Sequence, residues 1–279
     1  MNFRFAVGVP ENCSMLEVDG VQLAYVRSGR GPALVCLHAI GHGGGDFAEL
    51  EKSLRDRFDL IRIDWPGQGR SGPDAQAPSP KRYAQLLDGV LKSLNVEQPI
   101  LLGNSIGAAA ALLYAKQRPV MALILCDSGG LVPVNGFVRA FCAAFTWFFA
   151  AGARGARWFM PMFRCYYRFL VLPQKAAADQ RDRIIRSAYE IAPLLRDAWH
   201  GFGQADADLR AIAQALDVPV WFAWARQDRV IPLNLCMPCI RQMKQAEVTH
   251  YAGGHSAFLE QPDKFLEGFN AFTGALKSA

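Results

Sequence analysis

Short runs of apolar residues alternate along this chain with segments in which apolar residues recur at helical spacing. The short runs, which predict strands, are residues 33–38, 60–64, 100–102, 121–126, 218–225 and 248–251. Helical spacing of leucines and other apolar residues marks residues 81–94 and 106–117. Strands that alternate with helices predict an α/β fold with a mostly parallel central sheet, because such a sheet is covered by helices on both faces.

Two parts of the chain depart from this rhythm. Near the start, Asp19-Gly20 lies between two short alternating segments, so residues 18–28 predict an antiparallel hairpin. Between residues 131 and 210 the strand-like runs stop, and a segment rich in Phe, Trp, Tyr, Ala and Arg shows helical periodicity instead. We therefore predict a single domain whose core comprises residues 1–130 and 211–279, with an inserted helical cap over residues 131–210.

The composition narrows the class of protein. Hydrophobic residues make up 51% of the 279 residues and charged residues 20%, as in a globular protein with a large core. The formal net charge of +5 is too small to indicate nucleic-acid binding without a concentrated basic patch. Seven cysteines are scattered rather than spaced as a disulfide framework, which indicates reduced thiols. Cys236 and Cys239 form a CxxC motif, but no second motif or nearby histidine pair completes a metal site, so we expect no metal or cofactor.

The apolar segments do not predict membrane insertion. The first fourteen residues contain only a very short apolar run before Pro10 and so lack the core of a secretory signal. The longest apolar stretch, residues 137–162, is interrupted by Arg139, Arg154 and Arg157, which makes it a poor candidate for a spanning helix of about 20 apolar residues. We therefore expect a cytoplasmic protein whose partner is neither a membrane nor nucleic acid.

The sequence Gly103-Asn104-Ser105-Ile106-Gly107 matches the GxSxG pattern at the junction of a predicted strand and a predicted helix. In this context the serine lies on a sharp turn, and the two glycines let strand and helix approach closely. The helix that follows points its N-terminal dipole at the serine, which favours a negatively charged intermediate. Ser105 is therefore the candidate nucleophile, and a purely structural or phosphate-binding turn is the alternative.

A serine nucleophile requires a base, and the base requires a carboxylate that orients it. His255 follows the last predicted strand in a loop with two glycines, and we expect it to be the general base. Asp228 ends the run 221–228, and Asp127 follows the strand that ends at Cys126. Both carboxylates would lie at the carboxyl edge of the sheet. We expect Asp228 to orient His255 and keep Asp127 as the alternative acid.

Two backbone N–H groups are needed to bind the oxyanion that forms when a serine attacks a carbonyl group. The residue after the nucleophile, Ile106, supplies one of them. The loop after an early strand, residues 38–45, supplies the other, and Ile40 is the expected donor. The glycines of this loop would let its backbone approach a ligand closely, although a flexible turn has the same composition.

Together these motifs resemble the α/β-hydrolase superfamily over nearly the whole chain. Residues 64–71 look like its DxxGxGxS turn, residues 254–262 look like its histidine loop, and the order Ser105, Asp228, His255 is that of its catalytic triads. The resemblance implies the α/β-hydrolase fold. Because the nucleophile is serine, it also implies an esterase, a lactonase or a carbon–carbon bond hydrolase rather than a haloalkane dehalogenase or an epoxide hydrolase. Asp64 is expected to brace the turn that it begins.

One part of the resemblance points to hydrolases that act on ring-cleavage products of aromatic compounds, whose nucleophile turn is similar to Gly103-Asn104-Ser105. Their oxyanion loop has an HGGGPG-type sequence, whereas residues 38–45 contain no proline and carry Ala39 where glycine is usual. A carbon–carbon bond hydrolase, with cap arginines such as Arg164 or Arg168 binding a carboxylate, is therefore an alternative.

The resulting expectation is a serine hydrolase that cleaves a small or medium apolar carboxylic ester or lactone through an acyl-enzyme on Ser105. Its partner is a small-molecule substrate, and a homo-oligomer is left open. Cap aromatics are expected to line the substrate pocket, namely Phe141, Phe145, Trp147 and Trp158. The alternative outside the enzymes is a non-catalytic protein on the same scaffold that binds a ligand or a membrane surface. The membrane surface is considered because the cap is both aromatic and basic.

Overall fold

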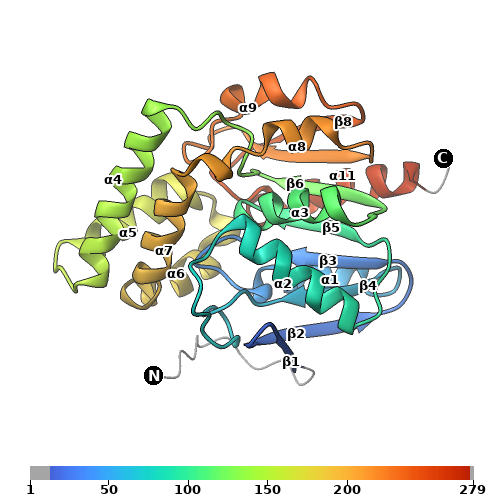
Figure 1. The fold of residues 1–279 in the computed structure, drawn as a ribbon, viewed down its shortest axis with the longest axis horizontal. Helices are drawn as coiled ribbons and strands as arrows, with labels where there is room; N and C mark the ends of the chain where they lie inside the picture. Colours follow the sequence, from blue (N-terminus) through green and yellow to red (C-terminus); the bar gives the residue numbers. More distant parts are fainter. Residues whose placement is uncertain (1–12, 277–279) are drawn as a thin grey trace.

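A computed structural model describes residues 13–276, and its centre is an eight-stranded sheet (Figure 1). The strands are β1 (Cys13–Val18), β2 (Val21–Gly29), β3 (Ala33–Leu37), β4 (Asp59–Ile63), β5 (Ile100–Asn104), β6 (Ala122–Cys126), β7 (Val220–Ala225) and β8 (Ala246–Tyr251). Their order is β1-β2-β4-β3-β5-β6-β7-β8. The pairs β1–β2 and β2–β4 are antiparallel, and all the others are parallel. The predicted hairpin and mostly parallel sheet are confirmed.

Helices cover both faces of the sheet. One face carries α2 (Pro80–Ser93), α3 (Ile106–Gln117), α8 (Arg210–Ala215) and α9 (Leu233–Ile240). The other carries the short helices η1 (Gly44–Phe47) and α10 (Ala257–Glu260) together with α1 (Ala48–Leu54) and α11 (Pro262–Ala275). Successive side chains of a strand point to opposite faces, so Val35 packs in one core and Leu34 in the other.

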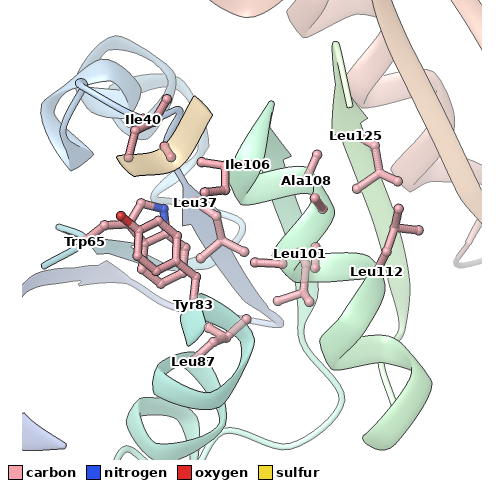
Figure 2. Close-up of a cluster of buried hydrophobic side chains, with 14 of the residues drawn as sticks. Leu37, Ile40, Trp65, Tyr83, Leu87, Leu101, Ile106, Ala108, Leu112 and Leu125 are labelled. Carbon is pink, nitrogen blue, oxygen red and sulfur yellow. The ribbon is translucent and has the colours of Figure 1, made fainter. Parts of the chain in front are cut away.

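The larger core fixes the end of the sheet where the candidate site lies. Figure 2 shows Leu37 of β3 beside Ile106 at the start of α3, in a buried cluster that also includes Leu101 of the neighbouring strand β5. Trp65 and Tyr83 stack beside them with ring centroids 4.4 Å apart. Because these side chains are fully buried, the turns that leave β3, β4 and β5 are held on a rigid base.

The segment between β6 and α8 is helical throughout its regular structure. Its elements are α4 (Gly136–Ala153), α5 (Phe159–Tyr166), η2 (Tyr167–Val171), η3 (Lys175–Ala177), α6 (Ala178–Arg186), α7 (Ala188–Phe202) and η4 (Ala205–Ala207). We call residues 131–210 the cap, as predicted from the sequence. In Figure 1 the cap helices lie together at one end of the molecule, beside the sheet rather than on its faces.

Helix α4 differs from the sequence-based expectation. Over 18 residues it has a mean hydropathy of 1.4, so by length and composition it qualifies as a membrane-spanning candidate. Only 22% of this window is buried inside the protein, so α4 is not an ordinary core helix either. The arginines do not interrupt it, because Arg139 lies in its first turn and Arg154 lies just beyond its end. The expectation of no secretory signal rests mostly on residues 1–12, which lie outside the described residues.

Candidate active site

The turn between β5 and α3 holds Ser105 in a strained conformation. Its backbone has φ of 55° and ψ of −113°, a region that residues other than glycine rarely adopt. The N–H of Ser105 donates to the carbonyl of Cys126 (3.0 Å), and its carbonyl accepts from the N–H of Gly129 (3.2 Å). The strand-to-helix turn predicted from GxSxG is therefore present at the carboxyl edge of the sheet.

The two glycines of this turn are required by space. A Cβ atom on Gly103 would lie 2.6 Å from the Cα of Ala108, and a Cβ atom on Gly107 would lie 2.3 Å from the carbonyl oxygen of Leu37. Folded proteins do not tolerate contacts this short between a Cβ and backbone atoms. Helix α3 can therefore pack directly on β3 and β5, with its N-terminus at Ser105.

His255 and Asp228 form a buried pair at the same edge. The imidazole Nδ1 donates to Oδ2 of Asp228 over 2.8 Å, and Oδ1 of Asp228 accepts from the N–H groups of Val230 (2.7 Å) and Ile231 (2.9 Å). Burial acts to lower the pKa of His255, but the charge and hydrogen bond of Asp228 outweigh it and raise that pKa above its ordinary value. The carboxylate that orients the imidazole is itself fixed by backbone donors.

Asn104 joins the turn that carries Ser105 to the loop that carries His255, which we call the histidine loop. Its Nδ2 donates to the carbonyl oxygens of Cys126 and His255 (3.1 Å each), and its Oδ1 accepts from the hydroxyl of Ser256 (2.8 Å). The side chain of Asn104 is fully buried, so these bonds are made without competition from water. Because Asn104 directly precedes Ser105, these bonds bring the histidine loop beside Ser105.

Glu260 holds the histidine loop on another side. Its Oε2 accepts from the N–H groups of Gly254 (2.6 Å), His255 (3.2 Å) and Ser256 (3.4 Å), and its Oε1 accepts from the N–H of Gln174 in the cap (3.1 Å). Burial raises the pKa of Glu260 to about 6, although the N–H donors act against this shift. One carboxylate therefore links the cap to the loop that carries the expected base.

The side chains of Ser105 and His255 are both buried, with 6% and 5% of each residue exposed. Among the hydrogen bonds of residues 13–276, none joins the hydroxyl of Ser105 to the imidazole. In unliganded hydrolases this contact is often longer than a hydrogen bond and tightens when the substrate binds.

Asp127 lies beside the pair and has different partners. Its Oδ1 accepts from the N–H of Ala225 (2.8 Å) and its Oδ2 from the N–H of Ala257 (3.3 Å), so it joins the end of β7 to the start of α10. Burial and the negative charge of Asp228 raise the pKa of Asp127 well above its usual range. The geometry favours Asp228 as the acid that orients His255, and Asp127 as a brace between two elements.

The expected oxyanion donors are available in the structure. Within the described part of the chain, the N–H groups of Ile40 and Ile106 donate to no other group. The loop that carries Ile40 is held by Gly41, whose N–H donates to Oε1 of Gln68 over 2.6 Å. An incoming oxyanion would therefore meet two donors that need not break an existing bond.

Two polar side chains fix the rest of this loop. Burial lowers the pKa of His38, and its neutral ring accepts the N–H of Trp65 at Nε2 over 2.9 Å. Asp64 accepts from the N–H groups of Gly44 (2.7 Å) and Arg70 (3.0 Å). Asp64 thus braces the turn that it begins, in the manner expected from the sequence.

Asp127, Asp228 and His255 also form a cluster whose ligand atoms lie within 4.8 Å of one another, close enough to share a metal ion. All four carboxylate oxygens already accept from backbone N–H groups or from the imidazole. A cation would have to displace these donors, so the cluster fits hydrogen bonding better than metal binding. Cys236 and Cys239 are free, buried thiols one turn apart on α9.

The cap aromatics divide into inner and outer groups. Phe141 and Phe145 are half-buried and pack on Trp199 of α7, with ring centroids 5.7 and 4.3 Å away. Trp147 and Trp158 are 62% and 42% exposed and stack on each other. Their exposure corrects the expectation that these two tryptophans line a buried substrate pocket, since a helix of this cap presents only one side to the core.

Two cavities border the cap. A groove of about 1130 Å³ lies against α1, α6 and the loop of residues 38–45, with Gly41, His42, Gln180 and Ile184 among its lining residues. A smaller one of about 300 Å³ is lined by Arg164, Arg168, Arg181, Asp182, Ile185 and Arg186. Neither lining includes Ser105 or His255, so the structure does not bring Arg164 and Arg168 to the candidate nucleophile.

A model of the alpha/beta hydrolase family matches residues 34–267, which is most of the chain. The chain belongs to the alpha/beta hydrolase family. The match runs from β3 into α11 and so includes Ser105, Asp228 and His255. The fold and the hydrolase class expected from the sequence are thereby confirmed.

Individual relatives are distant and carry different activities. The chain is 28% identical to the pimeloyl-[acyl-carrier protein] methyl ester esterase of Xanthomonas campestris, over 89% of this chain and 97% of the relative. It is 23% identical to a 2-hydroxy-6-oxononadienedioate/2-hydroxy-6-oxononatrienedioate hydrolase of a Pseudomonas species, over 83% and 84%. Among solved structures, a bacterial membrane phospholipase A superposes with a TM-score of 0.80 at 21% identity, covering 96% of this chain and 87% of that one. At that identity the likeness shows the fold.

Sequence reasoning missed the residues that hold the site together. Asn104 and Glu260 make buried hydrogen bonds to the loop that carries His255, and Gln68 makes one to the loop that carries Ile40. The available signal was a polar side chain next to small or apolar neighbours, as at Glu260 in Ala257-Phe258-Leu259-Glu260. A buried polar group requires partners, but the sequence does not say which ones.

Proposed function

We propose that this alpha/beta hydrolase is a serine hydrolase that cleaves a small or medium apolar carboxylic ester or lactone. The observation that carries the proposal is the convergence, at one edge of the sheet, of the strained Ser105 turn, the His255–Asp228 pair and the free N–H groups of Ile40 and Ile106. Acyl transfer to serine requires a nucleophile, a base, an orienting acid and oxyanion donors.

In the proposed reaction, Oγ of Ser105 attacks the carbonyl carbon while Nε2 of His255 accepts its proton. The N–H groups of Ile40 and Ile106 donate to the oxyanion, and Asp228 stabilises the imidazolium. The imidazolium then protonates the leaving oxygen, and the ester bond breaks to leave an acyl-enzyme. His255 next takes a proton from water, which attacks the acyl-enzyme, and return of that proton to Oγ releases the acid and restores Ser105.

Several observations favour an ester or lactone over the other candidates. The relative with the higher identity acts on a methyl ester, and the inner side of the cap is aromatic. The carbon–carbon alternative needs a carboxylate-binding arginine near the nucleophile, whereas Arg164 and Arg168 line a separate cavity. A non-catalytic role would leave the geometry of Ser105, His255 and Asp228 without a use.

The first test is covalent labelling with a fluorophosphonate. We expect the wild-type protein and a Ser53→Ala control, altered at an exposed serine, to be labelled, and Ser105→Ala not to be. Hydrolysis measured on esters, lactones and ring-fission products should fall to the residual of about 10³–10⁴ over water that remains when such triads are broken. Equal labelling of Ser105→Ala and wild type would reject the proposal, and turnover of ring-fission products alone would assign the carbon–carbon reaction instead.

A further inference from the structure

The outer side of the cap exposes an apolar face. On α4 the exposed positions include Phe137, Ala140 and Trp147, with Phe137 73% and Trp147 62% exposed. Trp147 stacks on Trp158 with ring centroids 5.5 Å apart, and Met162 follows one turn later on α5 at 53% exposure. We call these five residues the outer cap face. Water-exposed aromatics in contact with one another are unusual on a monomeric protein, where large exposed apolar patches mark binding sites.

This face lies in a segment with one sign of charge. Residues 128–178 contain five arginines and one lysine but no aspartate or glutamate. The chain holds 30 Lys and Arg and 25 Asp and Glu in all, so the remainder is close to neutral. The positive charge of the protein is therefore concentrated around the outer cap face rather than spread over the surface.

The same segment contributes to a cationic cavity. Arg164 and Arg168, one turn apart after Met162, line the cavity of about 300 Å³ together with Arg181 and Arg186 from α6. Asp182 is the one acidic side chain in this lining. Four guanidinium groups around a single carboxylate leave an excess of positive charge that an anionic group of phosphate size would neutralise.

The inner side of the same helices faces the proposed catalytic site. Tyr166, at the end of α5, has its pKa raised by burial and also by the charge of Asp228, which places it near the triad. Phe145 of α4 packs on Tyr166 with ring centroids 5.4 Å apart. A layer of cap side chains thus lies between the outer cap face and the candidate site.

We propose that the outer cap face docks on an anionic lipid surface, with its aromatic side chains in the headgroup region and the cavity of Arg164 and Arg168 binding the phosphate of lipids whose headgroups carry a net negative charge. An amphipathic segment with Trp and Phe on its face and arginines beside them has the composition of an interfacial helix. Lipid phosphates supply the negative charge that the segment lacks, and charge complementarity selects this partner. The inference departs from the expectation that no membrane is involved.

The packing of α4 favours lying on a membrane over crossing it. Phe141, Phe145 and Phe149 of α4 contact aromatic side chains inside the cap, and Phe149 is fully buried. A spanning α4 would have to leave these contacts, whereas a surface-bound α4 keeps them and buries only its exposed side. The bilayer would therefore meet the folded cap.

The test is flotation of the full-length Ser105→Ala protein with vesicles, so that binding is measured without any hydrolysis. One kind of vesicle is made of phosphatidylcholine alone, and the other contains about one third phosphatidylglycerol. Each basic residue near the surface should raise the affinity for the second, anionic kind by about five-fold. In the same background, Trp147→Ala with Trp158→Ala removes the aromatic anchors. Arg164→Gln with Arg168→Gln removes two charges of the cavity.

The matched control substitutions are at exposed positions outside the cap. Met121→Ala removes an exposed apolar side chain, and Lys81→Gln with Arg241→Gln removes two exposed charges outside the cap. We expect preferential binding to the anionic vesicles, a loss of about 30-fold for the arginine pair on those vesicles only, and a loss of about ten-fold or more on both vesicles for the tryptophan pair. The controls should bind as the parent does, and added salt should weaken binding to anionic vesicles.

Four outcomes would overturn the proposal. The first is that the parent does not float with either vesicle, and the second is that the tryptophan variant floats as well as the parent does. A protein that ignores vesicles but binds soluble polyglutamate through Arg164 and Arg168 would recognise an acidic polypeptide instead. A dimer in sedimentation velocity that the tryptophan substitutions convert to monomer would assign the face to a second copy of the chain. None of these outcomes depends on whether Ser105 is the nucleophile.

Discussion

At the scale of single residues, two carboxylates lie beside His255, and their partners separate their roles. Asp228 accepts from the imidazole, whereas Asp127 accepts from two backbone N–H groups. Without the orienting carboxylate, the imidazole is no longer held in the tautomer that carries its proton on Nδ1, and the imidazolium is no longer stabilised by a negative charge. We expect Asp228→Asn to lower kcat by about 10⁴.

Asp127→Asn is the matched comparison. Because the pKa of Asp127 is raised well above its usual range, the neutral amide of Asn resembles the protonated form of Asp127. The amide has one oxygen rather than two, however, so it accepts fewer N–H groups than the carboxylate. We expect this variant to lose about 1–3 kcal/mol of stability and less than about ten-fold in kcat. Melting curves and circular dichroism must show both variants folded before the rates are compared. If Asp127→Asn proves the inactive variant, the acid belongs after β6.

The pH dependence of the reaction follows from the same pair. A general base must be neutral to accept the serine proton, and the pKa of His255 is raised above its ordinary 6.5. Activity should therefore rise with pH through a midpoint above 6.5, measured as kcat/KM against pH. In Asp228→Asn the charge that raises the pKa is gone and burial remains, so the midpoint should move to lower pH. Asp197→Asn, at a partly exposed site on α7, should leave it in place, and a wild-type midpoint below 6.5 would contradict the assignment.

At the scale of elements, the loop after β8 is placed by Glu260 at the end of α10. The N–H groups of Gly254 and His255 donate to Oε2 of Glu260. In Glu260→Gln one of the two carboxylate oxygens becomes an NH₂ group, which cannot accept these N–H groups, so the loop should lose its fixed position. A small displacement of the base costs up to about 10²-fold in rate. We expect kcat to fall by about 10- to 100-fold with little change in KM. Glu267→Gln, on the exposed side of α11, is the control.

A second readout separates this positioning role from simple loss of structure. The pKa of Glu260 is raised from 4.5 to about 6, so its folded form holds a proton that the unfolded chain releases above about 4.5. Its contribution to stability is thus greatest below pH 4.5 and declines as pH rises through about 6. The difference between the melting temperature of the wild type and that of Glu260→Gln should therefore decrease as the pH is raised from 4.5 to about 6. A constant difference would mean that Glu260 does not titrate there.

Elements were predicted well where the signal is local. The bounds of α3 agree with the prediction because Gly107 and the apolar run after it belong to one continuous pattern, and the buried runs of β3 to β7 read as strands for the same reason. Strand β8 lies at the sheet edge, and all its residues before Tyr251 are half-buried or exposed, so its first residues carried a weaker signal. Asn104 and Ser256 are 152 positions apart, and no local pattern relates them. The pairing of distant polar groups had to come from the structure.

At the scale of the whole molecule, the cap is joined to the rest of the protein beside the histidine loop and beside the loop of residues 38–45. Glu260 links Gln174 to the histidine loop, and Asp46, which also accepts from His42 over 2.6 Å, accepts from the side chain of Gln180 on α6. A cap attached at these points is positioned to select substrates by the shape of its inner side. The outer cap face, by contrast, is exposed, with Phe137 and Trp147 73% and 62% exposed.

This division predicts how two neighbouring aromatics affect substrate choice. Phe145 faces inward between Trp199 and Tyr166, whereas Trp147, two residues later on α4, is mostly exposed. Replacing the inner ring with a smaller side chain makes room for substrate, and each methylene that fits is worth about 1 kcal/mol. In a series of p-nitrophenyl esters, Phe145→Leu should therefore shift the optimum of kcat/KM to longer acyl chains by about one or two methylenes. Trp147→Ala should leave the profile of the soluble, short-chain esters unchanged. Were Trp147→Ala to shift the profile while Phe145→Leu did not, the substrate would bind on the outer side of the cap and the inner aromatics would serve only to pack it.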